Sequence, residues 1–149
     1  MNVKIETISV EETDVIKPLW EELNKTHEHK SIFFADYYEN FTFYERKQKL
    51  FKSIDTQILI QIAKNKENVV GYCISTIYDN NIGEVDSIYV KKDFRNKKIG
   101  DSFLKSALEW FNSKNVKIKK VVVSYGNEEV FPFYEKYGFF PKHTLLEQK

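Results

Sequence analysis

The sequence has little cysteine, glycine, proline or net charge. Among 149 residues there are one Cys, five Gly and three Pro, and Lys plus Arg number 23 against 22 Asp plus Glu. A single cysteine, Cys73, permits neither an intrachain disulfide nor a cysteine-based metal site, and we expect it to be a buried apolar residue. The formal net charge of +1 lacks the strong basic excess of proteins that coat nucleic acid or anionic membranes.

Long apolar runs are also absent. No stretch approaches the roughly 18 consecutive apolar residues of a membrane helix. Residues 1–10 lack the basic and apolar segments of a signal peptide. The residues that are present include 42% hydrophobic and 15% aromatic types, enough to form a core and to exclude intrinsic disorder. We therefore expect a single domain over residues 1–149, soluble and located in the cytoplasm.

Hydrophobic periodicity predicts the order of the secondary structure. The expected elements are a strand at 3–8, a helix with its stripe at 15–23, a helix at 35–51, strands at 57–63, 69–78 and 82–90, a helix at 100–115, a strand at 119–124, a short helix at 128–137 and a final strand from 139. The three consecutive strands form an antiparallel meander, and the following helix is a right-handed crossover to a parallel strand. This order predicts an α+β fold with a mixed, mostly antiparallel twisted sheet flanked by helices.

Two details of the first helical region carry their own expectations. Pro18 lies inside the apolar stripe and predicts either a kink or a later helix start. The stretch 26–30 is polar and predicts a connection, in which His27 and His29 flank Glu28. Because no third or fourth ligand is evident, we expect these histidines in an exposed loop or in acceptor binding, and no metal site.

The strongest chemical signal is the basic segment 91–101, between a strand and an amphipathic helix. A helix N-terminus offers unpaired N–H groups and a positive dipole end, and nearby Lys and Arg side chains add charge. Phosphate is the natural ligand of such a site. Judged by charge alone, a solvated basic loop is an equal alternative.

Residues 95–100 resemble the acyl-CoA-binding segment of the GNAT N-acyltransferase superfamily, whose pattern is Arg or Gln, two residues, Gly, one residue, then Gly or Ala. Downstream, Asn127 and the segment 134–139 match the superfamily's asparagine and tyrosine segment in order and spacing. The resemblance covers about residues 82–140. It implies a GNAT-like fold and an acetyl-CoA-dependent N-acetyltransferase acting on a primary amine, with acetyl-CoA as co-substrate and no metal. The cofactor-binding residues that it implies are Ile88, Val90, Arg95, Asn96, Lys97, Lys98, Ile99, Gly100, Asp101, Asn127 and Tyr134.

One residue departs from the pattern, because Lys98 stands where the superfamily has its first loop glycine. Glycine there permits a positive φ and close approach of the backbone to phosphate. Lys98 can still offer its N–H if its φ is negative, and its ammonium could contact a phosphate.

The strand before the loop changes register partway. Its even positions are acidic at Glu84 and Asp86 and apolar at Ile88 and Val90, a change that a β-bulge produces. In the superfamily this strand is bulged and splays from its parallel neighbour, and the pantetheine arm pairs with its backbone. The resemblance assigns that pairing to Ile88 and Val90.

Acyl transfer needs a neutral amine, and an alkylamine with a pKa of about 10.4 is about 3.4 units, or ~4.6 kcal/mol, from neutrality at pH 7. We expect Glu84 to accept the proton, with Asp86 second and a water relay as a further route; hydrogen-bonded surface carboxylates are the plain alternative. The resemblance implies that Tyr134 is the general acid for the CoA thiolate, whereas its apolar surroundings alone predict a packed aromatic. Backbone N–H groups near Ile88 could polarise the thioester carbonyl.

The sequence gives little information about the acceptor substrate. The helices before the second strand contain many aromatics and several acidic residues, which would suit a cationic amine: Glu21, Glu22, Glu28, Asp36, Glu39 and Glu45. Two other functions stay open, namely a GNAT-like domain that senses acyl-CoA without turnover and a nucleic-acid-binding domain using the basic stretches 91–98 and 114–120. The sequence does not encode the oligomeric state, and a homodimer stays open because it is the commonest assembly of soluble proteins.

Overall fold

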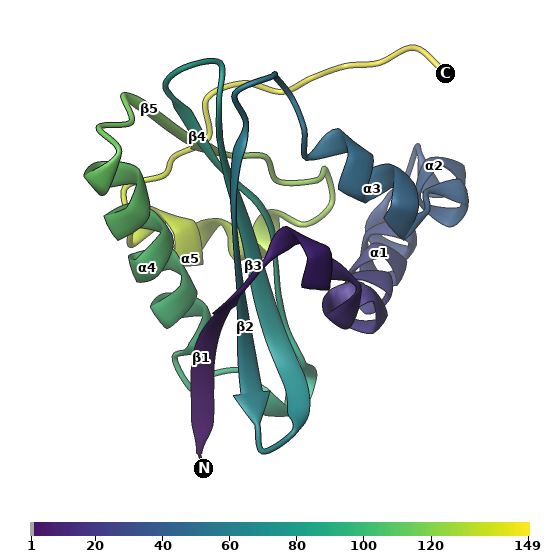
Figure 1. Cartoon of the computed structure of the whole chain (residues 1–149). Helices are drawn as coiled ribbons and strands as arrows, with labels where there is room; N and C mark the ends of the chain where they lie inside the picture. The colour runs from purple at the N-terminus through teal and green to yellow at the C-terminus, as the bar shows by residue number, and fades with distance from the viewer. Residues whose placement is uncertain (1) are drawn as a thin grey trace.

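One five-stranded sheet in the order β1-β2-β3-β4-β5 organises the chain, as seen in the computed structural model of residues 2–149 (Figure 1). The strands are β1 (Val3–Ile8), β2 (Gln57–Asn65), β3 (Asn68–Tyr78), β4 (Ile82–Val90) and β5 (Ile118–Val121). The first four strands are antiparallel neighbours, and β5 is parallel to β4. The predicted α+β class, with a mixed and mostly antiparallel sheet, is therefore confirmed.

Helices cover both faces of this sheet. Figure 1 shows α4 and α5 on one side and α1, α2 and α3 on the other. The α-helices are α1 (Lys17–Lys30), α2 (Ala35–Asn40), α3 (Phe43–Lys49), α4 (Ile99–Ser113) and α5 (Phe131–Glu135), and the 3-10 helices are η1 (Val10–Ile16), η2 (Lys92–Phe94) and η3 (Glu128–Val130). None of the helices described between residues 2 and 149 has the length and apolarity needed to cross a bilayer.

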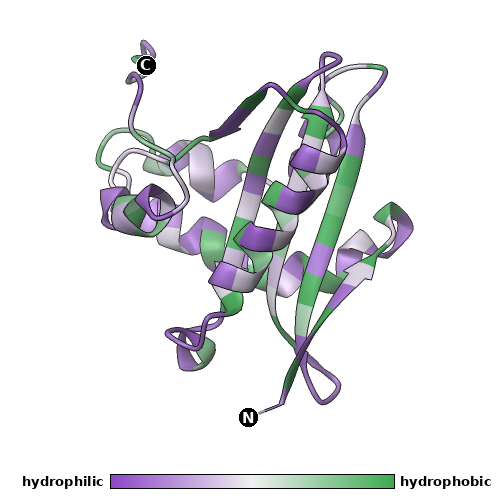
Figure 2. Cartoon of the chain, turned by 90° about the vertical axis from the view of Figure 1, so that its left-hand side faces the viewer, coloured by the Kyte–Doolittle hydropathy of each residue, from purple (hydrophilic) through white to green (hydrophobic). Residues whose placement is uncertain are grey.

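Each face of the sheet has its own hydrophobic core. Under α4, Phe103 and Phe111 pack with Cys73 and Val85, and all four are buried. Figure 2 shows α4 from this side with purple and green bands along its length, the pattern of a helix that buries one face. On the other face the core includes Trp20, Phe43, Tyr72 and Ile74. The sheet therefore separates two layers, each held by burial worth about 1.5–3 kcal/mol per large apolar side chain.

The predicted bulge in β4 is confirmed. The register steps from Ile74 opposite Ser87 to Ser75 opposite Val85, so Asp86 has no partner on β3. An extra residue exchanges the two faces of a strand beyond it. Ile88 and Val90 accordingly pack against the core under α4, whereas Glu84 lies opposite Thr76 on the face of α1 and α3.

The helical region before β2 differs from the prediction in two ways. Pro18 lies in the first turn of α1, so the later helix start is what occurs. The stretch 26–30, predicted as a polar connection, is the end of α1, and the exposed-loop placement of His27 is wrong because its ring packs on Tyr38 at 5.5 Å. The single helix predicted at 35–51 is two helices, because Thr42 begins α3 with a capping box.

The C-terminal part is less regular than predicted. β5 ends at Val121, and the expected helix at 128–137 is the short pair η3 and α5. Within the described residues no strand follows Phe139, which makes the predicted final strand wrong. Pro141 explains part of this difference, because proline cannot donate to a sheet ladder.

The segment after β5 is attached to the end of α1 and to α2. Lys30 Nζ donates to Asn127 Oδ1 at 3.0 Å, and Tyr38 Oη donates to Ser124 Oγ at 3.0 Å. Gly126, at φ 98°, lies directly under α1, and a Cβ there would overlap the carbonyl oxygen of Lys30. These contacts join the α1 layer to the segment between β5 and α5.

We expect Gly126→Ala to destabilise the protein by about 3 kcal/mol, of which about 1 kcal/mol is the cost of a Cβ at positive φ and the rest is overlap. Gly138→Ala is the matched control, because Gly138 also has positive φ (86°) but its Cβ would have nothing within 4 Å. Urea denaturation of both variants measures the difference. Equal losses would show that the Gly126 contact with α1 is absent in solution.

Candidate active site

Beyond the bulge, the edge of β4 that faces away from β3 has no neighbouring strand. β5 pairs with β4 only through residues Ile82 to Val85, so residues 86–90 have no parallel neighbour. The N–H of Lys91 donates to Val70 O at 2.8 Å, toward β3. Because successive strand residues alternate, the backbone groups of Val90 and Ile88 point away from β3. Val90 O indeed accepts a bond from Arg95 Nε at 2.8 Å.

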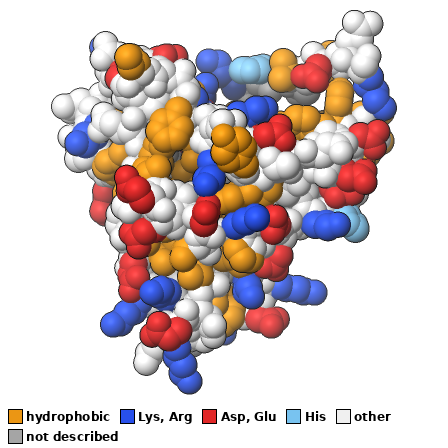
Figure 3. Space-filling model, turned by 45° about the vertical axis from the view of Figure 1, so that its right-hand side comes forward, with side chains coloured by type: hydrophobic (Ala, Val, Ile, Leu, Met, Phe, Trp, Pro, Cys, Tyr) orange, Lys and Arg blue, Asp and Glu red, His pale blue; other side chains and the backbone are white. Residues whose placement is uncertain are grey.

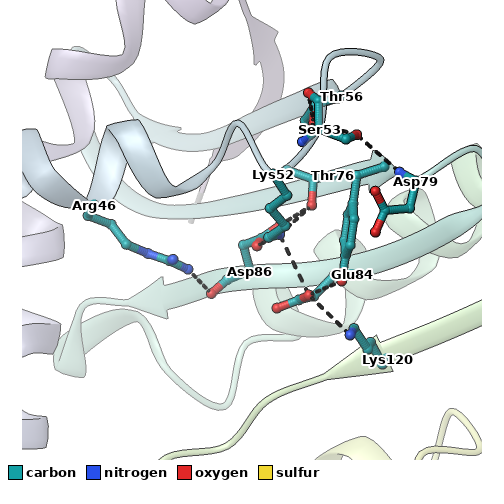
Figure 4. A network of polar contacts seen from close by, with 10 residues as sticks. Arg46, Lys52, Ser53, Thr56, Thr76, Asp79, Glu84, Asp86 and Lys120 are labelled. Carbon is teal, nitrogen blue, oxygen red and sulfur yellow. Dashed lines mark hydrogen bonds and ion pairs between the residues drawn. The ribbon is translucent and has the colours of Figure 1, made fainter.

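A polar network surrounds the bulge (Figure 4). The Asp86 side chain is 0% exposed and contacts Lys52 Nζ through Oδ1. Its other oxygen, Oδ2, accepts from Thr76 Oγ1 at 2.6 Å, and Lys52 Nζ also donates to Thr76 Oγ1 at 2.8 Å. Burial raises the pKa of Asp86 above its usual value, while Lys52 opposes that rise. Both oxygens of Asp86 are therefore occupied by the protein itself.

Glu84 is the more available carboxylate of the two. Its Oε1 accepts from Tyr78 Oη at 2.9 Å and lies 3.6 Å from Lys52 Nζ and 4.0 Å from Lys120 Nζ. No described residue hydrogen-bonds its Oε2, and the side chain is 12% exposed. Glu84 thus retains an oxygen for an incoming group, which Asp86 lacks.

Tyr134 lies on the other face of the sheet. It is buried in the core under α4 and makes edge contacts with Phe133 and Phe139, with ring centroids 5.3 Å and 6.3 Å away. Burial raises the pKa of its hydroxyl well above the ordinary value, so the phenol is protonated at neutral pH. Glu84 and Tyr134 make no contact with each other, because β4 lies between their two layers.

The loop before α4 has a backbone typical of glycine. Asn96 has φ 61°, and Lys98, which precedes the first helical residue, has φ 65° and ψ 19°. The condition that Lys98 has a negative φ is therefore not met; the lysine adopts the left-handed conformation that the superfamily pattern reserves for glycine. No side chain caps α4, and its first bond is Ser102 N to Lys98 O at 3.1 Å. The N–H groups of residues 99–101 have no intrahelical partner.

The other residues predicted for this loop divide into exposed and structural ones. Arg95, Asn96, Lys97 and Lys98 have exposed side chains. In contrast, Ile99 is a core residue, and Asp101 accepts hydrogen bonds from Tyr137 and Lys136, which lower the pKa of its carboxyl. A Cβ on Gly100 would meet the Phe133 ring at 3.3 Å. A cavity of about 200 Å³ borders Lys97 and Lys98 beside β1.

Several site residues could not be found from the sequence. Arg46 and Lys52 come from α3 and the segment after it, and Thr76 and Tyr78 come from β3. No sequence signal pointed to Arg46 or Lys52. For Thr76 and Tyr78 the signal was the pairing of β3 with β4, which places Thr76 opposite Glu84. Within residues 2–149 no group of His, Cys, Asp and Glu is arranged to hold a metal ion.

The acidic residues predicted to form an acceptor wall lie elsewhere. Glu21, Glu28 and Glu39 border a cavity of about 720 Å³, whose lining comes from η1 and helices α1 to α3 and includes Trp20 and Phe41. Figure 3, which brings this side of the molecule forward, shows acidic and basic side chains interspersed with exposed hydrophobic ones. No residue of β4 borders this cavity.

A family model and one curated relative both match this chain. Residues 17–139 match the family model described as the acetyltransferase (GNAT) family. An uncharacterized N-acetyltransferase of Methanocaldococcus jannaschii is 29% identical over 72 residues, which are 48% of this chain and 32% of that protein. The match thus spans about a third of the relative's length.

Solved structures share the fold. The PaiA N-acetyltransferase of Thermoplasma acidophilum, in complex with coenzyme A, superimposes with a TM-score of 0.75 at 24% identity over 97% of this chain and 93% of that one. An aminoglycoside acetyltransferase from an uncultured soil metagenomic sample, in complex with sisomicin, gives 0.69 at 13% identity over 99% and 94%.

The left-handed conformation of Lys98 predicts an unusual order of stability for the glycine and alanine variants at this position. We expect Lys98→Gly to be more stable than Lys98→Ala by about 1 kcal/mol, because only glycine lacks the Cβ that opposes this conformation. At the exposed position Lys105, in the middle of α4, the order should reverse by about the same amount. Chemical denaturation of the four variants provides the comparison. A more stable Lys98→Ala would show that Lys98 has a negative φ in solution.

Proposed function

Because this chain belongs to the acetyltransferase (GNAT) family, we propose that it transfers an acetyl group from acetyl-CoA to a primary amine of a small molecule or protein within a ternary complex. The observation that carries the proposal is the open edge of β4. Residues 86–90 have no parallel partner and lead directly into the uncapped N-terminus of α4.

The cofactor would bind along this edge. The outward backbone groups of Ile88 and Val90 would pair with the pantetheine arm as an added strand does. Its phosphates would meet the N–H groups of Ile99, Gly100 and Asp101 and the charges of the loop before α4. Arg95, Asn96, Lys97 and Lys98 supply that loop, and Arg95 would leave the Val90 carbonyl that it holds. Asn127 is the remaining cofactor residue in this proposal.

The two catalytic residues would then act from opposite faces of β4. The amine enters on the face of Glu84, which accepts its proton directly or through water as nitrogen attacks the thioester carbon. The oxyanion takes a hydrogen bond from backbone near Ile88, and the C–S bond breaks as the carbonyl reforms. Tyr134 donates its proton or a hydrogen bond to the departing CoA sulfur. Asp86 is a weaker candidate for the base because both of its oxygens are engaged.

The acceptor amine is proposed to be cationic before it reacts, because four carboxylates and three lysines line the α1 to α3 cavity, a net charge of −1: Asp14, Glu21, Glu28 and Glu39 against Lys17, Lys25 and Lys47. We further propose a single domain over residues 1–149 and a cytoplasmic location. The unpaired and buried thiol of Cys73 suits a reducing compartment, since burial raises its pKa to about 12 and leaves it unreactive.

Calorimetric titration with acetyl-CoA tests the cofactor half of the proposal. We expect one-to-one saturable binding, weakened about tenfold when Lys97 and Lys98 are both changed to Gln, because two ammonium groups near the phosphates are lost. Lys105→Gln, at an exposed lysine in the middle of α4, is the control and should leave the affinity unchanged. Absence of both heat and thermal stabilisation would refute acetyl-CoA binding. Binding without thiol release from any amine would favour an acyl-CoA sensor.

The hydroxyl of Tyr134 tests the chemical half. We expect Tyr134→Phe to lower kcat by about 100-fold, the usual contribution of a general acid. Acetyl-CoA affinity and stability should change little, since no described residue hydrogen-bonds this hydroxyl. Tyr125→Phe, at an exposed tyrosine, is the control. A parallel loss of affinity and kcat would show that Tyr134 has only a packing role.

A further inference from the structure

Arg46 reaches the bulge from α3 and lacks a counter-ion. Its Nη2 donates to Asp86 O at 2.6 Å, the carbonyl of the residue that the bulge leaves without a partner on β3. Among residues 2–149, no carboxylate oxygen lies within 4.0 Å of its guanidinium, although the side chain is half-buried. A guanidinium has five N–H donors, and with residues 2–149 that of Arg46 makes only this one bond. Arg46 therefore has unused donors and an unpaired positive charge next to Asp86 at the bulge.

The neighbouring charges do not supply the missing partner. Figure 4 shows Arg46, Lys52 and Lys120 together with the carboxylates of Glu84, Asp86 and Asp79, of which Asp79 is exposed at the end of β3. Lys52 contacts the carboxylates of both Glu84 and Asp86, and Lys120 approaches Glu84. Both acidic groups are thus compensated by lysines of the chain itself, and the uncompensated charge is the guanidinium.

The residues on the other side of Arg46 are also unable to neutralise it. Burial, followed by the charges of Lys30 and Arg46, lowers the pKa of His27 to about 4, so this ring is neutral at pH 7. Lys30 itself is paired with Glu129. Burial raises the pKa of Tyr72 although Arg46 opposes that rise, and its neutral hydroxyl is hydrogen-bonded with Ser87 Oγ at 2.7 Å. An anionic group from outside the chain is what this position lacks.

We infer that the acceptor is an amine that also carries a carboxylate, as amino acids do, and that Arg46 binds that carboxylate while the amine faces Glu84. This inference rests on the proposed function and names its substrate class. A guanidinium recognises a carboxylate through two parallel hydrogen bonds, which a lysine cannot reproduce. An amine without a carboxylate would leave the guanidinium of Arg46 unpaired.

Pairs of amines that differ only in the carboxylate test this inference: L-lysine against cadaverine, and L-ornithine against putrescine. With the wild-type protein we expect kcat/KM for the amino acid to exceed that for the diamine by about 30-fold, the worth of a charge-assisted bidentate contact. Arg46→Gln should remove that difference, and it should act on the amino acid through KM. A loss caused by the missing contact with the Asp86 carbonyl should fall equally on both amines, so the ratio of the two kcat/KM values is the readout.

Two further variants separate substrate binding from a structural role of Arg46. Arg46→Lys keeps one donor for Asp86 O and the charge, so it should fold normally yet lose most of the preference for amino acids. Lys49→Gln removes one positive charge from the same helix at a residue that contacts Tyr37 and Phe41, and should leave the preference intact. Equal turnover of the two amines by the wild type would overturn the inference. So would equal losses for both amines in Arg46→Lys.

A direct binding measurement distinguishes failure of this inference from failure of the proposed function. Calorimetry of L-lysine with the CoA-bound protein, or with the free protein if acetyl-CoA does not bind, reports the carboxylate site without turnover. Binding that Arg46→Gln abolishes would support the inference even if no amine were acetylated. Acetylation of diamines alone, with no binding of amino acids, would support the proposed function and overturn the inference.

Discussion

The bulge at Asp86 is the constraint on which the arrangement of the site depends. One extra residue in β4 leaves Asp86 without a partner on β3 and exchanges the two faces of the strand. Upstream of it, Glu84 faces α3 and the Lys52 ammonium. Downstream, Ile88 faces α4, and the pairing with β5 has already ended at Val85. A regular strand would put Glu84 and Ile88 on the same face of the sheet.

The bulge also explains why charged groups gather at one point. Asp86 is removed from water, and a buried carboxylate is costly unless it is paired and hydrogen-bonded. Lys52 and Thr76 meet that requirement, and Arg46 takes the carbonyl that the ladder leaves free. Replacing Lys52 by an apolar residue would leave the buried carboxylate of Asp86 without a charged partner. The same contacts that make the bulge tolerable therefore determine which oxygens remain open to a substrate.

Backbone strain also occurs at the other end of the site. Lys98 adopts a left-handed conformation that costs a residue with a Cβ about 1–2 kcal/mol, and Asn96 two residues earlier does the same. Strain of this kind persists where the surrounding structure enforces it, commonly at functional sites. Here the following residue, Ile99, is anchored in the core, so the loop turns sharply before α4 begins. The backbone N–H groups stay directed outward even though the glycine is missing.

The sequence by itself determined the order of the strands, the parallel crossover to β5, the bulge and the basic turn before α4. These features follow from periods of two or 3.6 residues and from local turn chemistry, which neighbouring residues encode together. Only the tertiary structure decided that Arg46 and Lys52 meet Asp86, that His27 lies on a helix, and that Tyr134 and Glu84 occupy opposite faces. Those contacts join residues 34 and 40 positions apart in the chain, and no local pattern records which side chains a folded sheet will bring together.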